Sequence, residues 1–284
     1  MVPHLPMVWL LLTAAVTPVE TQFVQVSPAV AAEAGIVRSA GQGRAVVLVE
    51  GLDPHPFKPQ RAARPQLRPW QKPTSVLVRT LSRDSDVFAF TYAQTAPVTD
   101  IADVPALAEQ IQRLHQAGYS EVVLVGFSAG GLIARQFAED HPTGVSRVIQ
   151  VCSPNIGSSL AKVKGVFGAI QEPFVQSLTK EARSRAMEER QGKRIPDGVD
   201  FVCVVGNGLG KGDGVVSTRS QWPEDLQAQG VPAFGLDTEH WKAMQTEKGA
   251  QLIAQLVRER QPRWAPAQVA AARKRLLHEE TGGR

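Results

Sequence analysis

The sequence is poor in the features that mark several large classes of protein. Only two of its 284 residues are cysteine, Cys152 and Cys203, which is too few for a disulfide framework, and no metal-ligand spacing occurs. Each cysteine ends or lies within an apolar run, so we predict two buried thiols. The net charge is only +4 and no nucleic-acid-binding motif appears, so we expect no nucleic-acid partner and no bound metal.

Long apolar runs are also lacking. Residues 7–16 form an apolar run of about ten residues, which is too short to span a bilayer but long enough for the core of a signal peptide. With Ala29, Val30 and Ala31 as the cleavage site, we predict that residues 1–31 are a signal peptide and that the protein is exported to the periplasm or the medium. Against this, no Lys or Arg precedes the run, and the tripeptide lies far downstream. The alternative is an apolar N-terminus or a misassigned start codon in a cytoplasmic protein.

Apolar runs and helical patterns alternate along the rest of the chain. Residues 20–43 lack a clear period and are interpreted as an irregular lead-in. Asp103 is the predicted N-cap of a helix that stops at Gly118. This alternation predicts an α/β fold with a mostly parallel sheet and helices on both faces. The predicted strands are residues 44–50, 86–92, 121–126, 147–152, 200–206 and 231–235.

Three regions are predicted from this pattern. A catalytic domain covers residues 32–265, and residues 157–198 are a helical insertion in it, with an apolar first half and a charged second half. We expect that insertion to be a cap or lid, or else helices that only cover the sheet. Residues 266–284 form a basic helical tail, interpreted either as a solvated helix or as a weak contact with an anionic membrane surface.

The most informative motif is Gly126-Phe127-Ser128-Ala129-Gly130. An apolar strand pattern ends at Gly126, and a helical pattern begins directly after Ser128. A serine at the apex of a strand, a sharp turn and a helix is typical of a nucleophile elbow.

A serine nucleophile needs a base and an acid that orients the base. His240 is the predicted base because it follows the last predicted strand and precedes the closing helix, and His55 is the runner-up because it follows the first predicted strand. Asp213 is the predicted acid because it lies between two glycines after the strand that ends at Gly206. Asp237 is the competing acid.

The developing oxyanion would be held by backbone N–H groups. Ala129, directly after the serine, supplies the first predicted donor, and Leu52, after the first predicted strand, supplies the second. This chemistry needs neither a metal nor an organic cofactor.

Four blocks together resemble the lipase and esterase branch of the α/β-hydrolases, including bacterial triacylglycerol lipases and GPI-inositol-deacylase-like proteins. They are Val49-Glu50-Gly51-Leu52, the elbow, Ser153-Pro154-Asn155-Ile156-Gly157-Ser158, and Asp213-Gly214-Val215-Val216 with His240 beyond. The family usually has His-Gly in the first block and Thr-Pro-His in the third. Here Glu50-Gly51 and Ser153-Pro154-Asn155 stand in those places.

The resemblance and the Ser-Asp-His order imply a serine carboxylic-ester hydrolase that acts on lipid or other acyl esters. An acyltransferase or thioesterase on the same three residues is the neighbouring alternative. A non-catalytic binding protein that kept the fold is the alternative from another class. The oligomeric state is open.

Overall fold

The computed structural model describes residues 19–30, 35–55, 58–162 and 167–277. Within these residues, one seven-stranded sheet has the order β1-β3-β2-β4-β5-β6-β7. Only β1 is antiparallel to its neighbour, and the other pairs are parallel. The strands are β1 (Thr21–Ser27), β2 (Arg44–Val49), β3 (Asp86–Tyr92), β4 (Glu121–Phe127), β5 (Arg147–Val151), β6 (Asp200–Gly206) and β7 (Ala233–Leu236).

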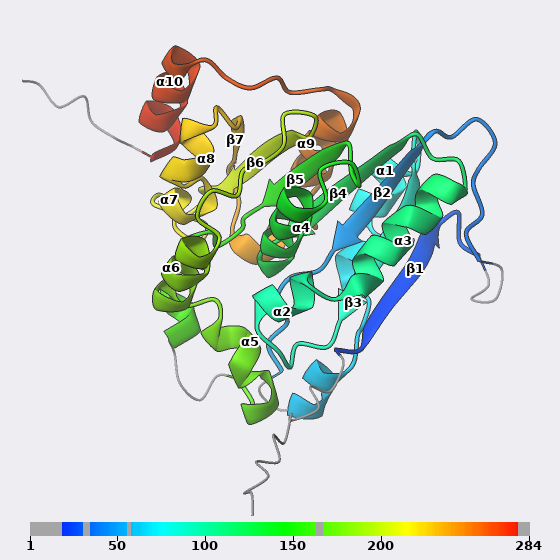
Figure 1. Cartoon of the computed structure of the whole chain (residues 1–284), viewed down its shortest axis with the longest axis horizontal. Helices are drawn as coiled ribbons and strands as arrows, with labels where there is room; N and C mark the ends of the chain where they lie inside the picture. The colour runs from blue at the N-terminus through cyan, green and yellow to red at the C-terminus, as the bar shows by residue number, and fades with distance from the viewer. Residues whose placement is uncertain (1–18, 31–34, 56–57, 163–166, 278–284) are drawn as a thin grey trace, which may run out of the picture.

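Helices cover both faces of this sheet (Figure 1). In β2, Val47 and Val49 belong to the apolar cluster that contains α2, α3 and α4, whereas Val46 and Leu48 belong to the cluster with α1 and α9. Strands covered on both faces need nearly continuous apolar sequence, as β2 has. The helices are α1 (Val76–Leu81), α2 (Val98–Ala102), α3 (Pro105–Gln116), α4 (Ala129–Asp140), α5 (Glu172–Gln176), α6 (Lys180–Glu189), α7 (Thr218–Gln221), α8 (Glu224–Ala228), α9 (Glu247–Arg258) and α10 (Pro266–Leu277).

The prediction of an irregular lead-in is wrong for Thr21–Ser27. This segment is β1, which pairs with β3 at the edge of the sheet, and Phe23 stacks on Phe88 with ring centroids 5.3 Å apart. Pairing with a buried neighbour supplies the order that the local pattern does not show. Cleavage after Ala31 would therefore remove a strand of the sheet. The apolar run 7–16 lies outside the described residues.

The predicted helix start at Asp103 is also wrong. Asp103 is the C-cap of the short helix α2, and α3 starts two residues later with Val104 as its N-cap and Pro105 in its first turn. Proline at the first helical position fits α3 well because its missing N–H would have no partner there. Cys152 and Cys203 are free and buried, as predicted.

Among its described residues, the segment 157–198 holds four short helices up to Glu189, and residues 190–198 are turn and loop. It contributes the short 3-10 helices η4 (Ser159–Lys162) and η5 (Ala169–Gln171), followed by α5 and α6. The described part of the basic tail, residues 266–277, is the docked helix α10. Its Val269, Ala272 and Leu276 are buried, whereas Lys274 and Arg275 are exposed. No helix among the described residues is long and apolar enough to cross a membrane.

Candidate active site

The elbow at Ser128 is a strained turn between β4 and α4. Ser128 has φ 52° and ψ −123°, a conformation that an L-residue adopts only under constraint. A Cβ on Gly126 would lie 2.5 Å from the carbonyl oxygen of Gly130 and 2.5 Å from the Cα of Gly131. Glycine at 126 therefore lets the helix start directly above the strand. The Ser128 N–H donates to the Val151 carbonyl at 2.8 Å, which ties the turn to β5.

The structure brings Ser128, His240 and Asp213 together in one line. The Ser128 Oγ lies 3.1 Å from His240 Nε2, and His240 Nδ1 lies 2.7 Å from Asp213 Oδ2. These side chains are buried, and His240 and Asp213 are only 1% exposed. A carboxylate can only accept a hydrogen bond, so Asp213 favours the His240 tautomer that carries its proton on Nδ1. In that tautomer Nε2 is free to accept the serine proton.

A tight turn fixes the carboxylate of Asp213. Its Oδ1 accepts the backbone N–H groups of Val215 and Val216 at 2.9 and 2.8 Å. Its Oδ2 also accepts a hydrogen bond from Gln221 Nε2 at 3.3 Å. The backbone carbonyl of Asp213 accepts the His240 N–H at 2.9 Å, so the turn positions both side chains.

The competing residues lie elsewhere. His55 Nε2 is 3.2 Å from Asp53 Oδ2, and burial lowers the pKa of His55. Asp237 is exposed after β7, while Asp213 takes the contact with His240.

The loop that carries Leu52 passes directly over the elbow. A Cβ on Gly51 would lie 2.7 Å from the Phe127 carbonyl oxygen and 2.8 Å from Ser128 Cβ. Gln94 holds this loop from both sides, because its Nε2 donates to the Gly51 carbonyl at 2.9 Å and its Oε1 accepts the Asp53 N–H at 3.1 Å. Leu52 thus lies between two anchored peptides, beside Ser128.

Glu50 is buried beneath this loop and does not face Ser128. Its Oε1 accepts the Tyr92 N–H at 2.8 Å, and the Tyr92 hydroxyl donates to the Glu50 carbonyl at 2.8 Å. Arg68 Nε lies 2.7 Å from Oε2 as an ion pair, although neither atom has a well-directed hydrogen bond. Burial raises the pKa of Glu50 to about 7, and the charge of Arg68 opposes that rise.

A small apolar cavity opens at Ser128. Its volume is about 60 Å³, and the segment 157–198 supplies much of its wall. The lining residues are Leu52, Pro54, Ser128, Pro154, Ser158, Leu160, Ala161, Phe167, Leu178, Val215, Val216, His240 and Trp241.

Sequence reasoning missed two residues that support the three central side chains. Gln221 holds Asp213, and its backbone carbonyl accepts a hydrogen bond from Asn155 Nδ2 at 3.2 Å. Asn155 lies in a block that the resemblance singled out without giving it a role, whereas Gln221, on the four-residue helix α7, carries no sequence signal.

One group of potential metal ligands occurs among the described residues. Cys152 Sγ, an Asp213 carboxylate oxygen and a His240 ring nitrogen lie within 4.8 Å of one another. Burial, reinforced by the charge of Asp213, raises the pKa of Cys152. In this structure Asp213 and His240 contact each other directly, with 2.7 Å between Oδ2 and Nδ1.

Comparisons with known proteins agree with this architecture. A family model described as the alpha/beta hydrolase fold matches residues 85–175. No curated protein matches the chain. The chain has the α/β-hydrolase fold, which confirms the fold that the resemblance implied.

Several solved structures share the fold at low sequence identity. The mature Bacillus licheniformis lipase BlEst2 is 17% identical with a TM-score of 0.57, covering 85% of this chain and 99% of that one. The metagenomic carboxyl esterase MGS0156 is 14% identical with a TM-score of 0.55, covering 77% and 76%. Aspergillus fumigatus lipase B is 16% identical with a TM-score of 0.52, covering 82% of this chain and 58% of that one. At identities this low, the structural similarity shows a shared fold alone.

Proposed function

We propose that the protein is a serine carboxylic-ester hydrolase that works through Ser128, His240 and Asp213. The observation that carries this proposal is the line from the Ser128 Oγ through the His240 ring to Asp213, with distances of 3.1 and 2.7 Å, at the floor of an apolar cavity. The fold, shared with proteins named as lipases and an esterase, supports it.

In the first half-reaction, the Ser128 Oγ attacks the ester carbonyl carbon while His240 Nε2 takes the hydroxyl proton. The carbonyl π electrons move to oxygen, where the N–H groups of Ala129 and Leu52 stabilise the negative charge. The intermediate then collapses, the C–O bond to the alcohol breaks, and His240 gives its proton to the leaving oxygen.

In the second half-reaction, water attacks the acyl-enzyme. His240 takes one proton from this water, and the tetrahedral intermediate releases the Ser128 Oγ, which recovers its proton from His240. The Asp213 carboxylate stabilises the imidazolium that forms in both halves. The products are an acid and an alcohol, and no cofactor enters the balance.

The cavity sets an expectation for the acyl group. A water needs roughly 10–15 Å³ of such space, so about 60 Å³ holds about four to six water-sized groups. We therefore expect a preference for short acyl chains in this conformation. Longer lipid chains would require Leu160 or Phe167 of the segment 157–198 to move aside.

The mechanism is tested by labelling with an active-site fluorophosphonate. Wild type and Ser184→Ala, which changes an exposed serine on α6, should be labelled, and Ser128→Ala should not. Labelling of Ser128→Ala, or none of wild type, would refute the proposal. A series of p-nitrophenyl esters then measures the chain-length preference, and product analysis with an added alcohol separates hydrolysis from acyl transfer.

Membrane contact by the tail is a separate proposal. The exposed Lys274 and Arg275 of α10 would be attracted to an anionic bilayer surface. Sedimentation with vesicles that contain anionic lipid should carry more protein down than vesicles of neutral lipid, and the difference should shrink at high salt.

A further inference from the structure

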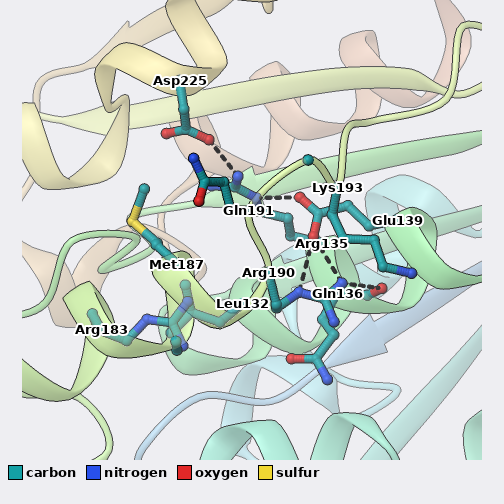
Figure 2. A pocket seen from close by; sticks show the side chains of 12 residues that line it. Leu132, Arg135, Gln136, Glu139, Arg183, Met187, Arg190, Gln191, Lys193 and Asp225 are labelled. Carbon is teal, nitrogen blue, oxygen red and sulfur yellow. Dashed lines mark hydrogen bonds and ion pairs between the residues drawn. The ribbon is translucent and has the colours of Figure 1, made fainter.

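A second cavity, of about 220 Å³, lies apart from Ser128, between α4 and the end of the segment 157–198. Figure 2 shows that the side chains converging on it come largely from α4 and from α6 with the turn that follows α6. Its lining includes four cationic side chains, Arg135, Arg183, Arg190 and Lys193. Nothing in the ester-hydrolase mechanism uses these residues.

Three of the four cations are neutralised by carboxylates. Glu139 lies between two of them, because its oxygens are 2.8 Å from Arg135 Nε and 2.9 Å from Arg190 Nη2. The pairs are Arg135 with Glu139 and Asp225, Arg190 with Glu139 and Asp140, and Lys193 with Asp140.

Arg183 is the one of these four cations that has no ion pair with a carboxylate among the described residues. It is only 8% exposed, and its Nε donates to the Asn155 carbonyl at 3.3 Å. No described carboxylate forms an ion pair with its guanidinium. Burial, with the charges of Arg135 and Arg190, lowers the pKa of Arg183 to about 10, and the charges of the nearby Glu139 and Asp225 oppose this fall. It therefore stays protonated at neutral pH, and four cations face three carboxylates.

A buried charge without a carboxylate at ion-pair distance is costly, and the guanidinium fork matches the oxygens of a phosphate or carboxylate group. We propose that this cavity binds a small oxyanion, a phosphate or carboxylate group, with Arg183 as its principal contact. The volume is below the roughly 300–1,000 Å³ of ordinary ligand pockets, so the site suits a free anion or the end group of a small ligand.

The site also lies beside the loop that supports the catalytic acid. Arg183 and Arg135 both donate to Asn155, to its carbonyl and its Oδ1 respectively. Asn155 in turn contacts Gln221, which holds Asp213. A chain of hydrogen bonds thus runs from Arg183 through Asn155 and Gln221 to Asp213. An anion on Arg183 would bind at the end of this chain that is farthest from Asp213.

The test is calorimetric titration of the full chain with inorganic phosphate and, separately, with acetate, at constant ionic strength set by sodium chloride. We expect saturable one-to-one binding of at least one of them. Arg183→Gln should weaken it by about tenfold or more, because a charge-assisted hydrogen bond is lost. Arg113→Gln makes the same charge change on the exposed surface of α3 and should bind like wild type.

The separate titrations with phosphate and acetate show which of the two oxyanion groups the cavity binds. Because no ester substrate is present, the result does not depend on the proposed ester-hydrolase activity. Arg183→Lys keeps the charge but loses the fork, so it should bind more weakly than wild type, and it also serves if Arg183→Gln does not fold by circular dichroism. Wild type that binds neither anion, or a folded Arg183 variant that binds as tightly as wild type, would overturn the proposal.

Discussion

Replacing Glu50 with glutamine tests how the loop next to Ser128 is held. The Glu50 carboxyl is completely buried, and its pKa is raised from 4.5 to about 7, chiefly by burial. Between these two pH values, the folded protein binds more protons at this side chain than the unfolded chain does. Folding stability therefore falls as pH rises through this window.

The size of the effect follows from the shift. One pKa unit corresponds to about 1.4 kcal/mol, so the ionisation of Glu50 removes about 3 kcal/mol of stability between pH 4.5 and 8. Glu50→Gln keeps the shape and an oxygen for the Tyr92 N–H but cannot ionise. The ion pair with Arg68 forms only as Glu50 ionises, so its contribution is already contained in the pKa of Glu50.

Urea unfolding of both proteins at several pH values measures this difference. The free energy of unfolding of wild type minus that of Glu50→Gln should fall by about 3 kcal/mol from pH 4.5 to 8. The exposed variant Glu189→Gln should run parallel to wild type over the same range. Parallel curves for wild type and Glu50→Gln would refute the reasoning, since they would mean that Glu50 ionises equally in both states.

Three further changes give distinct expectations. Asp213→Asn should lower kcat by roughly 10³–10⁴-fold with little change in KM, because an amide facing His240 favours the wrong tautomer; near-normal steady-state turnover of a p-nitrophenyl ester would contradict the assignment. Gly130→Ala should lower the free energy of unfolding, measured in urea, by about 2 kcal/mol or more, because its Cβ would collide with the Glu50 carbonyl. The control Gly198→Ala, where nothing lies within 4 Å of the added Cβ, should change that free energy by less than about 0.5 kcal/mol. Mass spectrometry of the purified protein should find an N-terminus that retains Thr21, because β1 covers the edge of β3; a fully active protein that begins at residue 32 would show that this strand is dispensable.

The sequence alone determined the elements with strong local signals. Alternating apolar strands and amphipathic helices predicted the parallel sheet, because strands covered on both faces require continuous apolar runs. The elbow around Ser128 was visible because a tight strand-to-helix turn needs small residues at fixed offsets. Chain order pointed to Asp213 and His240, since the carboxyl ends of parallel strands meet at one edge of a sheet.

The tertiary structure decided what depends on contacts between distant segments. β1 was missed because its order comes from pairing with β3 rather than from its own pattern. The support of Asp213 by Gln221, and the burial of Glu50 against Tyr92 and Arg68, join segments that no local spacing relates. The environment of Arg183 is likewise a property of packing. In the sequence it is one cation in a charged helix, and only the fold removes it from water without a carboxylate at ion-pair distance.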